Sequence, residues 1–195
     1  MAVCWTLLLA LTLSTSLIPG AHPLSDAAVL IAFKYSLTDP LNVLMTWDDS
    51  QPNPCNWDHI TCNDENRVIR MTLSPSQLSG NLIPELGSLS ALEQMILDYN
   101  EFSGTIPFEL GNLRELTTLN IRGNALSGNI PPSLGNLQKL TTLGLDFNQL
   151  TGKIPSEIGT LKNLRIAAFN DNRDLCYDFR PTPVFRGDYP QCQYM

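Results

Sequence analysis

From residue 65 onward, hydrophobic residues recur along the chain with a period of 24 residues. Three successive copies match at most apolar, Gly, Pro and Asn positions. They are 89–112 (LSALEQMILDYNEFSGTIPFELGN), 113–136 (LRELTTLNIRGNALSGNIPPSLGN) and 137–160 (LQKLTTLGLDFNQLTGKIPSEIGT). A degenerate copy precedes them at 65–88, and a partial one begins at Leu161. This repetition predicts a solenoid of stacked coils, because one such unit cannot bury its apolar face alone.

Within each copy, two apolar residues separated by one residue predict a short strand with one buried face. Stacked copies would pair these strands into a parallel sheet. The predicted buried pairs are Met71/Leu73, Met95/Leu97, Leu119/Ile121, Leu143/Leu145 and Ala167/Phe169.

Three polar or conformationally special positions also recur in the repeats. An asparagine follows each strand, where its amide can donate to and accept from the backbone of neighbouring turns. A glycine marks a bend that a side chain would obstruct, and a proline excludes a long helix on the outer side. The residues are Asn100, Asn124, Asn148 and Asn172; Gly80, Gly104, Gly128 and Gly152; and Pro107, Pro131 and Pro155.

The segments that flank the repeats are expected to cover the two apolar ends of the solenoid. Ser25 is a good helix N-cap, and the Asp39-Pro40 pair ends the helical pattern. Ala27, Leu30, Ile31 and Leu37 are expected on one face of that helix. The aromatic, proline-containing tail predicts a cover for the last coil. The organisation is therefore an N-terminal cap at 23–64, repeats at 65–175 (four full and one partial) and a C-terminal cap at 176–195.

Residues 5–17, WTLLLALTLSTSL, are uncharged and rich in leucine. This stretch is too short to span a bilayer and has the length of a signal-peptide core. The small residues Gly20 and Ala21 follow it, so residues 1–22 are expected to be removed as a signal peptide. The alternatives are a membrane anchor and a buried N-terminal helix. No later stretch approaches the length of a spanning helix, which predicts an exported mature chain without a transmembrane segment.

Four cysteines lie outside the predicted signal peptide: Cys55 and Cys62 before the repeats, and Cys176 and Cys192 after them. Four cysteines allow three pairings. The pairs 55–62 and 176–192 are favoured because each closes a short segment at one end of the chain. A zinc site is the alternative, although no CxxC motif supports it. Export together with paired cysteines indicates structural disulfides.

Charge and residue inventory exclude several classes of function. The formal net charge is −7 at pH 7, with 19 acids against 12 bases, which argues against nucleic acid and anionic membranes as partners. The two histidines are too few for a catalytic triad or an HExxH site. Gly152-Lys153 is followed by Ile154, where a phosphate loop needs Ser or Thr. We therefore expect neither an enzyme nor a bound cofactor or metal.

The motif S-G-x-I-P-x-x-L-G at 103–111 and 127–135 resembles the plant-specific class of leucine-rich repeats. Residues 39–87 resemble the N-terminal cap and first repeat of the somatic embryogenesis receptor-like kinases, and NDNRDLC at 170–176 is similar to the start of their C-terminal cap. The resemblance implies an α/β solenoid: a right-handed superhelix with a short-stranded parallel sheet and a helical N-terminal cap. It also implies a short ectodomain of the kind that acts as a co-receptor.

The chain has no counterpart of the kinases' Pro-rich stem, transmembrane helix or kinase domain. It is more similar to the stand-alone leucine-rich-repeat proteins, which are linked to plant defence and extracellular protein contacts. In the kinases, a Phe-His pair before the second cap cysteine reaches the ligand and the partner receptor. The matching residues are Asp58 and His59, so the histidine is present and the aromatic is not. Two family tyrosines correspond to Gln94 and Asp98, with Tyr99 adjacent.

The exposed side of the predicted sheet is the candidate binding surface, because repeat scaffolds present extended concave faces. Aromatic residues and arginine dominate interface hot spots. One outward column reads Ser74, Asp98, Arg122, Asp146 and Asn170, and the next reads Pro75, Tyr99, Gly123, Phe147 and Asp171. The candidate protein-binding residues are His59, Arg70, Gln94, Asp98, Tyr99, Arg122, Asp146 and Phe147.

Together these features predict a secreted, extracellular module of the apoplast that binds a protein or peptide, with receptor-like kinase ectodomains as the partner class. An alternative is an inhibitor of a secreted microbial enzyme such as a polygalacturonase. A third is a structural adaptor in the cell wall or at the outer face of the plasma membrane.

Overall fold

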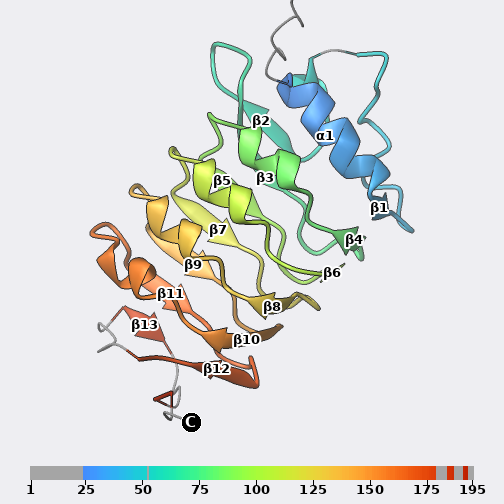
Figure 1. The fold of residues 1–195 in the computed structure, drawn as a ribbon. Helices are drawn as coiled ribbons and strands as arrows, with labels where there is room; N and C mark the ends of the chain where they lie inside the picture. The colour runs from blue at the N-terminus through green and yellow to red at the C-terminus, as the bar shows by residue number, and fades with distance from the viewer. Residues whose placement is uncertain (1–23, 52, 179–183, 187–190, 193–195) are drawn as a thin grey trace, which may run out of the picture.

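A computed structural model of the chain describes residues 24–51, 53–178, 184–186 and 191–192. The predicted signal peptide at 1–22 and most of the predicted C-terminal cap lie outside these residues. The described chain is a solenoid whose coils stack in sequence order from α1 to β12 (Figure 1). In this part of the protein, no helix has both the length and the apolarity needed to cross a bilayer.

The N-terminal helix α1 (Asp26–Tyr35) begins at Ser25, whose side chain accepts a hydrogen bond from the backbone N–H of Ala28. The expectation that the helix extends to Leu37 was wrong. Ser36 closes the last turn, and Leu37 begins strand β1 (Leu37–Thr38), which pairs antiparallel with β4 (Ser79–Asn81). Leu37 lies opposite Gly80, where a Cβ would come within 2.4 Å of the Ser36 carbonyl oxygen. The chain therefore leaves the helix early because glycine leaves room for an extra strand.

The main sheet has seven strands in the order β13-β11-β9-β7-β5-β3-β2. All neighbours are parallel except β2 and β3, which are antiparallel. The strands are β2 (Ile60–Cys62), β3 (Val68–Thr72), β5 (Gln94–Ile96), β7 (Thr118–Asn120), β9 (Thr142–Gly144), β11 (Ile166–Ala168) and β13 (Phe185–Arg186). Every residue of the five predicted apolar pairs is buried, which confirms the predicted strands and their inward face.

A second set of short strands, which the sequence did not reveal, follows the asparagine turns. One sheet has the order β1-β4-β6 and the other β12-β10-β8, and an isolated bridge between Thr105 and Ser127 links them. The remaining strands are β6 (Glu101–Ser103), β8 (Ser127–Asn129), β10 (Gln149–Lys153) and β12 (Asp174–Cys176). The recurrent glycines lie within or next to these strands at positive φ, which confirms the predicted bends.

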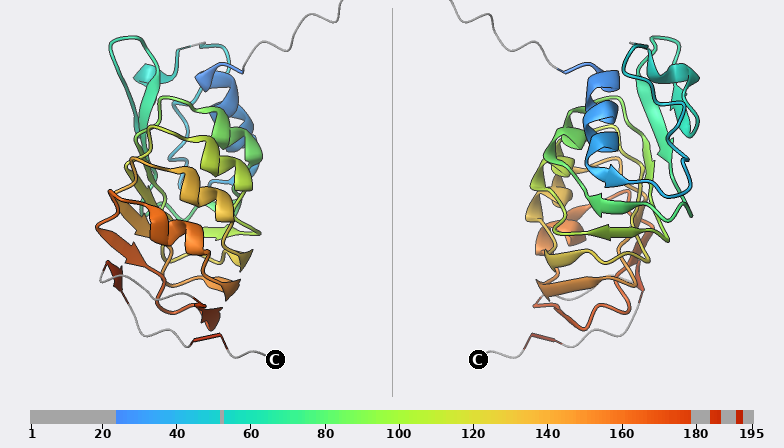
Figure 2. Two further views of the ribbon diagram at one scale, coloured as in Figure 1. Left: turned by 60° about the vertical axis from the view of Figure 1, so that its left-hand side comes forward. Right: turned by 90° about the vertical axis from the view of Figure 1, so that its right-hand side faces the viewer.

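On the outer side, each coil forms one short 3-10 helix, and Figure 2 shows these helices stacked in a column opposite the main sheet. Pro107, Pro131 and Pro155 each occupy the N-cap position, with φ between −61° and −66°. The helices are η1 (Pro54–Asn56) in the cap, and then η2 (Pro84–Ser88), η3 (Phe108–Asn112), η4 (Pro132–Asn136) and η5 (Ser156–Thr160). The expectation that proline excludes a long helix here is confirmed.

The recurrent asparagines hold successive coils together. Asn100 Oδ1 accepts hydrogen bonds from the backbone N–H groups of Ser76 (3.1 Å) and Leu78 (3.0 Å), while its Nδ2 donates to the Leu73 carbonyl at 2.7 Å. Asn124, Asn148 and Asn172 repeat this pattern. These amides satisfy backbone groups away from water, as their recurrence predicted.

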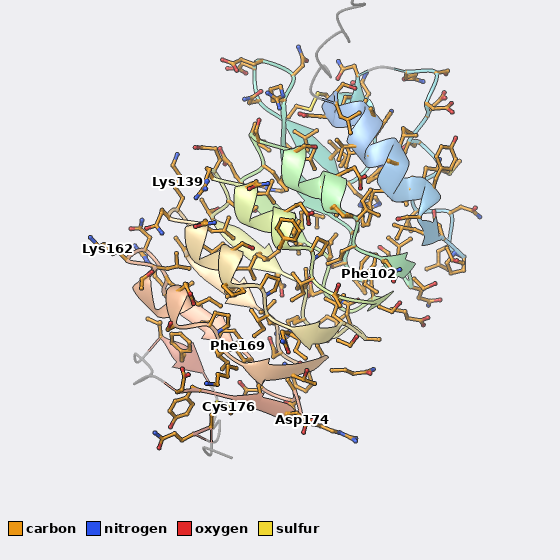
Figure 3. All side chains as sticks on the ribbon, in the orientation of Figure 1. Phe102, Lys139, Lys162, Phe169, Asp174 and Cys176 are labelled. Carbon is orange, nitrogen blue, oxygen red and sulfur yellow. A yellow bond between two sulfur atoms is a disulfide. The ribbon has the colours of Figure 1, made fainter. Side chains whose placement is uncertain are left out.

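Aromatic contacts and disulfides cover the two ends of the core. Phe33 of α1 stacks on Phe102 of the first full repeat, with ring centroids 6.0 Å apart, and Phe169 stacks on Phe185 at 5.5 Å. Figure 3 shows Phe102 and Phe169 inside the stack, whereas Lys139 and Lys162 extend away from it. The disulfides are Cys55–Cys62 and Cys176–Cys192, which confirms the favoured pairing.

Candidate functional site

The predicted binding residues lie on or beside the exposed face of the main sheet, except for Asp146, which is buried. Arg70 of β3 and Gln94 of β5 are Cα partners on neighbouring strands. Arg70 is exposed, and Gln94 and Asp98 are half-buried. His59 is exposed before the edge strand β2, and its carbonyl accepts a hydrogen bond from Thr72 N–H. Strands β3 and β5 separate it from β7, which leads to Arg122, so the structure places His59 at one end of the surface.

Tyr99, Arg122 and Phe147, three of the predicted residues, form one stacked cluster. The Arg122 guanidinium carbon lies 5.0 Å from the centre of the Tyr99 ring and 5.6 Å from that of Phe147. These distances lie within the range of cation–π attraction. Tyr99 comes from the preceding coil and Phe147 from the following one, so three successive repeats build the cluster.

Backbone hydrogen bonds that continue beyond the strands fix the register of this cluster. Tyr99 N–H donates to the Arg122 carbonyl at 3.0 Å, and Gly123 N–H donates to the Asp146 carbonyl at 2.9 Å. Phe147 N–H donates to the Asn170 carbonyl at 2.8 Å. The main chain thus holds both rings and the guanidinium on one rigid scaffold, which limits the entropy lost when a partner binds.

Both aromatic residues adopt a backbone conformation that bulky side chains rarely take. Tyr99 has φ +54° and Phe147 φ +55°, in the left-handed region where glycine and asparagine are preferred. Between them, Gly123 has φ +64°, and a Cβ there would lie 2.7 Å from Tyr99 Cδ1. Glycine at 123 therefore leaves room for the Tyr99 ring. The left-handed backbone of Tyr99 and Phe147 is strained, and such strain is common at functional sites.

Asp146 does not fit the prediction that its whole column points into solvent. It is only 6% exposed, and its Oδ2 lies 3.3 Å from Arg122 Nε. Nε is itself buried and is not aligned to donate a hydrogen bond, so the contact is an ion pair. Arg122 lies one coil earlier and covers Asp146, which removes the carboxylate from direct contact with a partner. Asp146 instead supports Arg122.

The structure adds two features that were not among the predicted residues. One is the row of residues that lie between the two members of each buried pair and face the exposed side of the sheet: Thr72, Ile96, Asn120, Gly144 and Ala168. The alternation that identified the buried pairs implies this row as well. The other is an open groove of about 1200 Å³ beside Phe147, whose lining includes Asn170, Asp171 and Arg173. Besides Asn124, its lining consists of 147–150 and 170–175, which come from successive coils near the end of the stack.

The chemistry of this surface is that of non-covalent recognition. It offers two exposed aromatic rings, one fixed guanidinium, and amide and hydroxyl groups on a rigid sheet. Over the described part of the chain, His, Cys, Asp and Glu residues do not gather into a group that could hold a metal ion.

Comparison with known proteins matches the cap and the repeats to family models. The family described as "Leucine rich repeat N-terminal domain" matches residues 23–63, and "Leucine Rich Repeat" matches 91–113, 115–137 and 139–161. The chain is 48% identical over 94 residues to Leucine-rich repeat protein 1 of Arabidopsis thaliana. That match covers 48% of this chain and 43% of the relative, and the similar rice proteins are covered to 36%.

Solved structures with this fold include plant receptor ectodomains and a plant ice-binding protein, which gives a TM-score of 0.69 at 31% identity over 78% of this chain and 49% of that one. The BIR2 ectodomain from Arabidopsis thaliana superposes with a TM-score of 0.73 at 30% identity, over 84% of this chain and 98% of that one. The ectodomain of the Arabidopsis receptor kinase HAESA, in complex with an extended IDA peptide hormone ligand, gives a TM-score of 0.55 at 29% identity. This match covers 83% of this chain and 29% of the HAESA chain. By its cap, its repeats and its likeness to BIR2 over nearly the whole of that ectodomain, the chain belongs to the plant leucine-rich-repeat family, whose members generally serve as non-catalytic scaffolds for protein interaction.

Proposed function

We propose that this protein is a secreted recognition module that binds a protein or peptide through the exposed face of its main sheet. The stacked cluster of Tyr99, Arg122 and Phe147 is the observation that carries the proposal. Tyr99 is 53% exposed and Phe147 49% exposed, although both rings are held by Arg122. Aromatic and arginine side chains that are fixed before binding are typical anchors of an interface.

We infer that the partners are ectodomains of plant receptor kinases or the peptides that such ectodomains bind. BIR2 is a receptor ectodomain of nearly the same extent, and HAESA holds a peptide hormone. Two disulfides at the ends of the solenoid favour an oxidising compartment, in agreement with the predicted signal peptide and with the apoplast. A role in defence or signalling at the cell surface follows from such partners.

The proposal is tested by affinity capture from plant extracellular fluid, with the purified full-length secreted protein as bait. A bait carrying both Tyr99→Ala and Phe147→Ala is the matched control. We expect receptor ectodomains on the wild-type bait and their loss from the control bait. Capture of a microbial polygalacturonase instead would favour the inhibitor hypothesis. Equal capture by both baits would show that the partner does not bind through Tyr99 and Phe147 on the exposed face of the main sheet.

A further inference from the structure

We propose that the open groove beside Phe147 binds a short, uncharged oligosaccharide. This site goes beyond the proposed protein-binding surface, with whose candidate residues it shares only Phe147. The groove has a volume of about 1200 Å³ and lies near the C-terminal end of the stack. Pockets that hold one small molecule measure about 300–1000 Å³, so the groove has room for more than one sugar unit.

The exposed walls of the groove combine one aromatic ring with planar polar groups. The ring belongs to Phe147, which is 49% exposed. The other exposed residues of the lining carry amide, carboxylate or guanidinium groups: Gln149, Asn170, Asp171, Arg173 and Asp174. Two successive coils supply these residues, and Figure 3 shows Asp174 on the later one, close to the end of the stack.

Hydrogen bonds within and between coils fix the floor of the groove. Asn172 Oδ1 accepts a hydrogen bond from the Leu150 N–H at 2.9 Å, and its Nδ2 donates to the Phe169 carbonyl at 2.7 Å. On the preceding coil, Asn148 Nδ2 donates to the Leu145 carbonyl at 3.1 Å. The floor is therefore formed before a ligand binds, which reduces the entropy lost on binding.

A sugar has the chemistry that complements these walls. A pyranose ring carries hydroxyl groups around its edge and a flat patch of C–H groups on one face. Hydroxyls on adjacent carbon atoms both donate and accept, so a planar amide, carboxylate or guanidinium can bridge two of them. The C–H patch is apolar and packs on an aromatic side chain such as Phe147, which removes both surfaces from water.

The charge of the groove favours a neutral ligand. Asp171 and Asp174 contribute two carboxylates and Arg173 one guanidinium, so a phosphate or a uronic acid would meet excess negative charge. A peptide is a weaker candidate, because bound peptides place side chains in apolar pockets. Among the described residues of the lining, Phe147 is the only apolar one that is exposed.

Two sources supply neutral oligosaccharides: polysaccharides of the cell wall, and glycans on a glycoprotein partner. The experiment applies the full-length secreted protein to oligosaccharides immobilised through their reducing ends. Cello-, xylo- and manno-oligosaccharides represent the wall, plant N-glycans represent glycoproteins, and oligogalacturonates are the charged comparison. We expect binding to one of the two neutral groups, which identifies the source. Binding to oligogalacturonates should be about tenfold weaker or more.

The variants Gln149→Ala and Asp174→Ala remove polar groups from the two coils that line the groove. Each should weaken binding to the selected saccharide about three- to tenfold, and the double variant should weaken it further, at an unchanged melting temperature. Asp64→Ala is the matched control, because it removes an exposed carboxylate from the turn between β2 and β3. This control should bind like the wild type.

Three results would overturn the inference: no binding to any neutral saccharide, tighter binding to oligogalacturonates, or full binding by the double variant. Capture of receptor ectodomains separates this inference from the proposed function. The Gln149→Ala/Asp174→Ala protein should still capture them, and Tyr99→Ala should still bind the saccharide. A wild-type protein that captures ectodomains through Tyr99 but binds no saccharide would leave the proposed function standing alone. Saccharide binding without capture would leave only the groove.

Discussion

Arg67, which directly precedes the first strand of the repeat stack, forms a bidentate ion pair with Asp26 of the N-terminal helix. Its Nε and Nη2 atoms donate to the two carboxylate oxygens, each at 3.0 Å, and Val68 N–H donates to the same carboxylate at 2.8 Å. The hydrogen bonds to Asp26 raise the pKa of Arg67. Since Asp26 is buried at the start of α1, these contacts fix the helix against β3, the first strand of the repeat stack.

The first prediction is that Asp26→Asn loosens the cap. The substitution keeps the shape but replaces a charged acceptor of three hydrogen bonds with an amide. We expect the free energy of unfolding to fall by about 1.5–3 kcal/mol, towards the lower end because the Arg67 side chain is 41% exposed. Denaturant unfolding measures the change. Asp64→Asn is the control, because Asp64 is exposed in the turn between β2 and β3, and this variant should be as stable as the wild type. If the two variants had the same free energy of unfolding, the proposed role of the Asp26–Arg67 pair would be contradicted.

The sequence predicted the repeating parts of the fold well and the local exceptions poorly. The 24-residue period aligned the buried pairs, the asparagines and the prolines, because each column faces the same surroundings in every coil. The end of α1 depends instead on Gly80, which lies more than forty residues further along the chain and leaves room for β1. Four of the strands in the two three-stranded sheets, β4, β6, β8 and β10, contain or border a glycine, so their sequences resemble those of turns.

The candidate site shows the same division. The exposure of Tyr99 and Phe147 could be predicted from their column in the repeat. The burial of the aspartates in the preceding column could not. Asp98 is half-buried and Asp146 is buried, although both occupy the same position in their repeats. The difference arises because Arg122 pairs with Asp146 rather than with Asp98. A contact between coils of this kind depends on side-chain direction, which periodicity leaves open.

Asn124→Ala tests the asparagine columns. It removes the acceptor of the Phe102 N–H and the donor to the Leu97 and Ile121 carbonyls. Backbone groups left without partners destabilise a fold, and we expect a loss of about 1–3 kcal/mol in the free energy of unfolding. Asn129→Ala is the matched control, since that amide is exposed on β8. The assignment fails if the two variants unfold at the same denaturant concentration.

Leu119→Asp tests the inward face of β7. Leu119 is fully buried, so the substitution places an unpaired carboxylate in the core, at a cost of several kcal/mol. We expect the variant to be retained in cells or to unfold well below the wild-type temperature. Thr118→Asp introduces the same charge one residue earlier, on the exposed face, and should be secreted and folded. Similar yields and melting temperatures for the two variants would show that the buried and exposed faces of β7 are wrongly assigned.

Gly123→Ala separates the position of the Tyr99 ring from general stability. Its Cβ would displace the ring, in addition to the strain of a left-handed alanine. Gly128→Ala carries the backbone strain at φ +75° but approaches only Thr105, at 3.1 Å. Both variants should lose about 1 kcal/mol of stability, whereas Gly123→Ala alone should weaken binding to the captured partner. Titration by calorimetry distinguishes the two, and equal affinities would mean that the ring position is unimportant.

The last prediction concerns which exposed aromatic residues bind a partner. Phe147 on the sheet side is 49% exposed and held by Arg122, whereas Phe108 on the outer side is 67% exposed at the start of η3. If exposure alone made a contact residue, Phe108 would be the stronger candidate. We expect the opposite, because a ring that is already ordered loses less entropy on binding. Tyr99→Ala and Phe147→Ala should each reduce affinity for the captured partner by about 1–2 kcal/mol or more, and Phe108→Ala should leave it unchanged. Surface plasmon resonance with the three variants decides the matter, since a loss confined to Phe108→Ala would move the binding surface to the outer side of the solenoid.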